Sequence, residues 1–260
     1  MVDQTAGLEI HQFPCLSDNY GVLIRDGERG VVASIDAPSA ADVKAALAAK
    51  GWKLTHILTT HHHHDHTDGN LELKRDTGCH IVGPLSEAQK IPGIDEAVAE
   101  GDTFKWGSFD VTVIETPGHT KGHIIYWMPA AKVAFVGDTL FALGCGRVNE
   151  GSMADMWSGL AKLSKLPGDT MLYCGHEYTA SNARFALTIE PENEALQARA
   201  KLVDALRAEG KPTLPTRLDL ELATNPFLRV NSAAIRQRLG METAEDWQVF
   251  GELRERKNRG

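Results

Sequence analysis

The sequence contains no long hydrophobic run, few cysteines and no excess of positive charge. Its longest apolar segments are about as long as a strand, whereas a membrane-spanning helix needs roughly 20 apolar residues. The four cysteines (positions 15, 79, 145 and 174) have no CxxC spacing, which argues against a disulfide framework and favours a reducing compartment. A formal net charge of −8 disfavours nonspecific binding to nucleic acid or to an anionic membrane. These absences predict a soluble globular protein without a membrane or nucleic-acid partner.

The beginning of the chain, "MVDQTAGLEIHQFP", has no basic start followed by an apolar core. No secretory signal is therefore predicted, and the cytoplasm is the expected location. A chain of 260 residues is long enough for one large domain, or for a medium domain with an appendage.

Strand and helix patterns are mixed up to about residue 177. Apolar segments predict strands at 8–13, 21–26, 30–37, 54–60, 79–84, 109–117, 123–129, 132–140 and 170–178. Helices are predicted at 41–51, in a segment after Asp68, and at 152–168, where Ser152 and Asp155 form a capping box. Several strands follow one another directly, which favours two sheets with outer helices over one doubly wound sheet.

The pattern changes after Tyr178. Residues 181–211 have helical periodicity with one break at Glu190–Pro191, and a proline-rich loop follows at 211–227. Two more helices are predicted from about Ser232 and Thr243, and no strand candidate occurs in this part. The sequence thus predicts a β-rich catalytic domain at 1–177 and a helical domain at 178–260.

The most unusual segment is "THHHHDH", which directly follows a predicted strand. His61 and His63 are two residues apart, so on an extended backbone both face the same way and can bind one ion. Asp65 and His66 are placed to serve a second ion. A solvated polar patch is the alternative interpretation, but metal-ligating side chains at this density are typical of a metal site.

Further candidate ligands end other predicted strands. They are His119, Asp138 and His176. Seven candidates are too many for one tetrahedral ion and suit two, with the two oxygens of Asp138 able to bridge them. His62 and His64 alternate with the ligands, so they are predicted to face away and to support the site by packing or hydrogen bonding.

These residues match the THxHxDH signature of the metallo-β-lactamase superfamily, and the segments of His119, Asp138 and His176 occur in that family's order. Within the superfamily the chain resembles the glyoxalase II family, the hydroxyacylglutathione hydrolases. "CLSDNYGVLI", "GDTLFALGCGR", "CGHEYT", "NPFLR" and "LRERKN" carry this resemblance, which spans essentially the whole chain. It implies an αββα sandwich of two mixed sheets with an all-α C-terminal domain.

The resemblance also implies roles for individual residues. Metal one would be bound by His61, His63 and His119, and metal two by Asp65, His66 and His176, with Asp138 as the bridge. Glutathione would contact Arg147, Tyr178, Arg254 and Lys257. Asp65 and Asp138 would be catalytic. The chain departs from the family pattern at Asn149, where an aromatic residue is usual, and at Asp68, where a small residue is usual. We expect the latter to change the loop modestly without loss of a ligand.

Two divalent ions, with zinc expected and iron or manganese as alternatives, would activate a water that hydrolyses the thioester of a glutathione substrate. The acidic chain ends in a basic segment, residues 253–260, which suits a carboxylate of glutathione or simply complements a helix dipole. The alternatives are a mono-iron persulfide dioxygenase, another hydrolase of the same fold such as a β-lactamase, and a metal-storage module without turnover. A monomer is expected.

Overall fold

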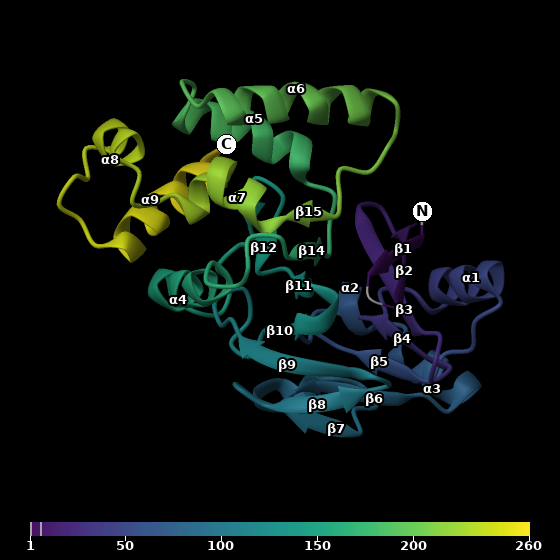
Figure 1. Cartoon of the computed structure of the whole chain (residues 1–260). Coiled ribbons are helices and arrows are strands. Elements are labelled where there is room, and N and C mark those ends of the chain that lie inside the picture. The colour runs from purple at the N-terminus through teal and green to yellow at the C-terminus, as the bar shows by residue number, and fades with distance from the viewer. Residues whose placement is uncertain (1, 6) are drawn as a thin grey trace. The chain divides into compact units, whose positions relative to one another are not determined.

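A computed structural model describes residues 2–5 and 7–260 of the chain (Figure 1). These residues form two compact units. Unit 1 contains the chain up to residue 115 and residues 120–137, and unit 2 contains residues 116–119 and 138–260. The predicted domain boundary near residue 177 is a different division of the chain, and it stays a prediction.

The first sheet of unit 1 contains seven strands in sequence order. They are β1 (Val2–Thr5), β2 (Leu8–Cys15), β3 (Asn19–Asp26), β4 (Val31–Ile35), β5 (His56–Leu58), β6 (His80–Pro84) and β7 (Glu96–Val98). The strands from β1 to β4 pair antiparallel, and those from β4 to β7 pair parallel. A mixed sheet results, in which the parallel strands place the ends of β4 and β5 next to each other.

Two helices cover this sheet, α1 (Ala40–Lys50) and α3 (Asn70–Thr77) (Figure 1). Their apolar side chains, such as Val43 and Leu73, join the strand residues in one buried cluster. The predicted end of α1 is confirmed, since Gly51 adopts a left-handed φ of 65° and its N–H bonds the last turn.

Unit 1 also contains a four-stranded antiparallel meander. Its strands are β8 (Thr103–Trp106), β9 (Phe109–Glu115), β10 (Ile124–Met128) and β11 (Val133–Gly137), and they pair in that order. Short helical segments complete the unit: α2 (His64–Thr67), η1 (Leu85–Lys90) and η2 (Pro129–Ala131). Every residue of β11 is buried, in agreement with its continuous apolar sequence.

Unit 2 is mainly helical. Its helices are α4 (Met153–Leu163), α5 (Thr179–Ile189), α6 (Glu194–Ala208), α7 (Leu218–Thr224), η3 (Pro226–Leu228), α8 (Ala233–Leu239) and α9 (Asp246–Arg259). Its short strands form two antiparallel pairs, β12 (Leu140–Phe141) with β13 (Gly144–Cys145), and β14 (Met171–Cys174) with β15 (Thr216–Arg217). Figure 1 shows α5 and α6 side by side, and their apolar faces share one core cluster.

The sequence predicted several of these boundaries, but it did not predict β1, β7 or β8. Ser152 and Asp155 form the predicted capping box of α4, although the helix ends at Leu163, before the predicted stop at Pro167. The break at Glu190–Pro191 separates α5 from α6. No described helix is long and apolar enough to cross a membrane.

The prediction for residues 211–227 was wrong in detail, because this segment contains β15 and α7 instead of a plain loop. The buried face of α7 includes Glu221 and Thr224, so the segment has little apolar periodicity. Their polar groups are satisfied by Arg199 of α6, whose guanidinium donates to both side chains. A helix stabilised by a buried ion pair is not visible in a hydrophobic pattern.

We expect Arg199→Ala to lower the free energy of unfolding by about 3–5 kcal/mol, because it leaves the fully buried Glu221 carboxylate without its cation. Urea unfolding followed by circular dichroism measures the effect. Arg217→Ala is the matched control, since the partner of Arg217, Asp219, is about half exposed, and a change within about 0.5 kcal/mol is expected. Equal destabilisation by the two variants would contradict this account of α7.

Candidate metal and substrate sites

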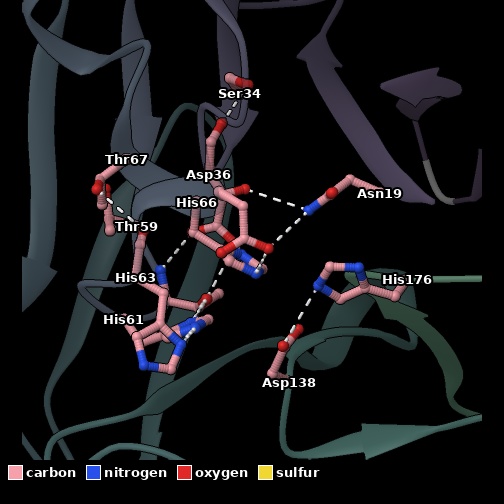
Figure 2. A network of polar contacts seen from close by, with 12 residues as sticks. Asn19, Ser34, Asp36, Thr59, His61, His63, His66, Thr67, Asp138 and His176 are labelled. Carbon is pink, nitrogen blue, oxygen red and sulfur yellow. Dashed lines mark hydrogen bonds and ion pairs between the residues drawn. The ribbon is translucent and has the colours of Figure 1, made fainter. Parts of the chain in front are cut away.

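All seven candidate ligands lie on segments that directly follow a strand or on the short helix after it. In unit 1 the histidine loop (residues 59–67) leaves β5 in an extended conformation and then forms α2. His61 Nε2 lies 3.1 Å from His63 Nδ1, so the two rings face each other as the alternation predicts (Figure 2). Their role as ligands stays a prediction.

His66 is oriented by a carboxylate that was not predicted from the sequence. The Oδ2 atom of Asp36 lies 2.8 Å from His66 Nδ1 (Figure 2). The same oxygen also accepts the hydroxyl of Thr60 at 2.9 Å. Thr60 Oγ1 is in turn 3.0 Å from His61 Nδ1. One carboxylate therefore influences two candidate ligands. The available signal was "VVASID", an apolar strand that ends in an aspartate.

Asp65 is a partly accessible candidate ligand of unit 1, with a side chain 43% exposed. Asn19 of β3 donates its side-chain amide to Asp65 Oδ2 at 3.1 Å and to the Asp65 carbonyl at 3.2 Å. Asp65 Oδ2 is also 3.7 Å from His66 Nε2. The carboxylate is thus held beside the imidazole with which it is proposed to share an ion.

The other histidines of this region differ in their surroundings. His64 is 95% exposed in its side chain and bonds Asp68 one turn later, so Asp68 lies on the outer face of α2. His62 contacts the buried Glu87. His123 is fully buried and stacks on the ring of His61, with 4.7 Å between centroids. His64 faces away from His61 and His63 as predicted, whereas the ring of His62 contacts Glu87 and also meets the ring of His63 edge-on, with 5.2 Å between centroids.

Unit 2 brings together His119, Asp138 and His176. Asp138 Oδ2 lies 3.4 Å from the Nε2 atom of each histidine, so one carboxylate oxygen stands between two imidazoles. His119 Nδ1 donates to the backbone carbonyl of Arg147 at 2.9 Å. All three side chains are buried.

The chemistry of these donors fits a divalent metal. Nδ1 of His66 and of His119 is engaged by an oxygen acceptor, which fixes the ring tautomer and presents Nε2 for ligation. The donors are imidazole and carboxylate, which suit zinc, iron or manganese. Burial raises the pKa of the Cys145 thiol to about 11 and raises that of Cys174 further, so both behave as neutral packing groups.

Unit 2 also contains a cavity of about 620 Å³. Its lining includes His119, Asp138 and all four residues that were predicted to bind glutathione. The remaining lining residues, which were not predicted individually, are Phe141, Cys145, Ser181, Asn182, Asn258, Arg259 and Gly260. The cavity therefore joins the candidate ligands of unit 2 to the C-terminal end of α9.

The cavity is strongly cationic. Arg147, Arg254, Lys257 and Arg259 all line it. Burial, followed by repulsion from Arg254, Arg184 and Arg147, lowers the pKa of Lys257. Like charges held this close together favour binding of an anion, which relieves their repulsion.

The cationic residues are not equivalent. Arg254 is only 4% exposed, and it donates from Nη1 to the Cys145 carbonyl at 2.9 Å and from Nε to Asn258 Oδ1 at 3.1 Å. Lys257 is half-buried and donates to Ser181 Oγ at 2.9 Å. Arg254 therefore supports the cavity wall, whereas Lys257 is more exposed to a ligand in the cavity.

Aromatic residues connect the cavity to the candidate ligands of unit 2. The ring of Tyr178 stacks on His176, with 4.9 Å between centroids and an interplanar angle of 3°. Phe141 meets both rings edge-on. Asn149 is exposed and lies outside the cavity lining among the described residues.

Two family models match the chain. The model described as "Metallo-beta-lactamase superfamily" matches residues 22–176, and the one described as "Hydroxyacylglutathione hydrolase C-terminus" matches residues 177–260. Proteins named hydroxyacylglutathione hydrolase from Brucella ovis and Brucella abortus are 59% identical over 251 residues, covering 96% of this chain and 98% of theirs.

Solved structures with low sequence identity share the fold. ETHE1 from Myxococcus xanthus aligns with a TM-score of 0.66 at 24% identity, covering 96% of this chain and 99% of that one. The BLEG-1 B3 metallo-β-lactamase aligns with a TM-score of 0.65 at 18% identity, covering 84% and 99%. The predicted fold class is confirmed, and the chain belongs to the hydroxyacylglutathione hydrolase family of the metallo-β-lactamase superfamily.

Proposed function

We propose that this protein hydrolyses the thioester of glutathione and a 2-hydroxy acid, typically S-D-lactoylglutathione. The observation that carries the proposal is the 59% identity to proteins named hydroxyacylglutathione hydrolase over nearly the full length of both chains. The cationic cavity beside His119 and Asp138 supports it, because glutathione carries two carboxylates. A persulfide dioxygenase is disfavoured by the match of the C-terminal family model.

The proposed ligand set contains seven residues. Metal one would be held by His61, His63 and His119, and metal two by Asp65, His66 and His176, with Asp138 serving both ions. The facing rings of His61 and His63 support this set, as does the position of Asp138 between two imidazoles. Zinc is the expected metal, and iron or manganese would suit the same donors.

When bound by these residues, two divalent ions would supply a shared water with a pKa lowered towards neutrality and would polarise the thioester carbonyl. The carboxylates of Asp65 and Asp138 would hold the ions, and with them the water and the thioester, in place. Asn19 positions the first carboxylate, and His119 and His176 flank the second.

Glutathione would contact Arg147, Tyr178, Arg254 and Lys257, with Lys257 and Arg147 binding its carboxylates away from the thioester. The departing glutathione thiolate has a pKa of about 8.5, so no dedicated general acid is needed. A monomeric state and a cytoplasmic location stay predictions.

We expect two metal ions per chain at saturation. His63→Ala should lose one ion, because a ligand is removed, whereas His62→Ala should keep both, because its ring faces Glu87. Metal analysis after loading and desalting measures the stoichiometry. One ion in the parent would contradict the dinuclear assignment, and equal loss in both variants would contradict the facing of the rings.

Lys257→Ala should raise KM and leave kcat nearly unchanged, because a group remote from the thioester binds the ground and transition states alike. A charge-assisted hydrogen bond contributes roughly 1.5–3 kcal/mol, so kcat/KM should fall roughly ten- to a hundredfold. Steady-state kinetics with S-D-lactoylglutathione provide the measurement. A lactoyl thioester of a small uncharged thiol should react equally well with variant and parent.

Arg256→Ala is the matched control, since Arg256 is on the same helix but pairs with Glu252 and is not among the cavity residues. It should behave like the parent on both substrates. Equal slowing of both substrates by Lys257→Ala would mean that Lys257 maintains the structure and does not bind glutathione.

A further inference from the structure

A buried carboxylate outside the proposed ligand set connects two segments of unit 1. Glu87 lies in η1 and is only 2% exposed. Its Oε2 accepts the backbone N–H of His62 at 2.9 Å and lies 2.8 Å from the Nδ1 atom of the same residue. Its Oε1 accepts the backbone N–H of Gly122 at 2.7 Å.

Both segments carry imidazoles of the candidate metal site. His62 stands between His61 and His63 in the histidine loop. Gly122 precedes His123, whose ring stacks on that of His61. Glu87 therefore fixes the backbone next to His61 and next to the ring that covers it.

The contact with the second segment depends on a glycine. A Cβ atom at Gly122 would lie 2.6 Å from Glu87 Cγ and 2.5 Å from Ser86 Oγ, which is too close for any side chain. The glycine thus allows η1 to approach the backbone directly, and the carboxylate oxygen reaches the N–H without an intervening side chain.

We propose that Glu87 is a positioning residue, whose carboxylate fixes the histidine loop so that His61 and His63 face one ion. This role rests on the proposed function. Each oxygen of Glu87 accepts one backbone N–H, from His62 and from Gly122, so both oxygens must be acceptors. An amide would place its NH2 group against one of these donors and displace the loop.

Glu87→Gln tests the role while preserving the size of the side chain. We expect a folded protein whose zinc affinity falls roughly ten- to a hundredfold, as for other groups that orient ligands. The visible absorption of the Co(II)-loaded protein should also change, because it reports the geometry of the ligands. Glu96→Gln is the matched control, since Glu96 also bonds a histidine, His80, at 3.0 Å but is exposed on β7.

Zinc titration and Co(II) spectra of the parent and both variants decide the matter. Parent-like affinity and spectrum in folded Glu87→Gln would overturn the proposal. A Glu87→Gln chain that fails to fold would also overturn it, because the carboxylate would then be required for the fold itself. A parent that binds neither ion would instead refute the proposed function.

Discussion

The carboxylate of Asp36 determines the geometry on which the histidine loop depends. Asp36 follows β4 with a left-handed φ of 56°, a conformation that costs a residue other than glycine about 1–3 kcal/mol. Thr60 donates to it from both its backbone N–H and its hydroxyl, and His66 bonds it from Nδ1. These bonds form in the buried interior, where they are strong enough to offset the strain and to hold the turn after β4 in one conformation.

Unit 2 uses a comparable arrangement around the hairpin of β12 and β13. Leu143, at its turn, has a left-handed φ of 58°, and its N–H donates to the buried Glu221 at 2.9 Å. Asn225 donates to the carbonyls of Phe141 and Gly144. The strained turn is thus held by side chains from the helical part of the unit, and the hairpin carries Phe141 and Cys145 into the cavity wall.

Structure was predicted correctly where a sequence pattern has a single physical cause. Alternating residues on an extended segment correctly predicted that His61 and His63 face each other, and the capping box placed the start of α4. The same reasoning missed α7, because its buried face is polar, and it missed Asp36 and Glu87, because a single acidic residue in a sequence does not reveal its burial. Arg254 shows the related difficulty: its charge indicated a substrate contact, whereas its hydrogen bonds also support the cavity wall.

The distribution of charge explains how an acidic protein can bind an acidic substrate. The net charge of −8 alone would repel glutathione, whose carboxylates are ionised at neutral pH. Local charge decides binding over short distances, because salt screens interactions beyond about 8–10 Å. The cavity concentrates Arg147, Arg254, Lys257 and Arg259, and burial together with repulsion between cations already lowers the pKa of Lys257. A bound carboxylate would relieve this repulsion and raise the pKa of Lys257 again, so the repulsion among the cations favours binding of an anionic ligand.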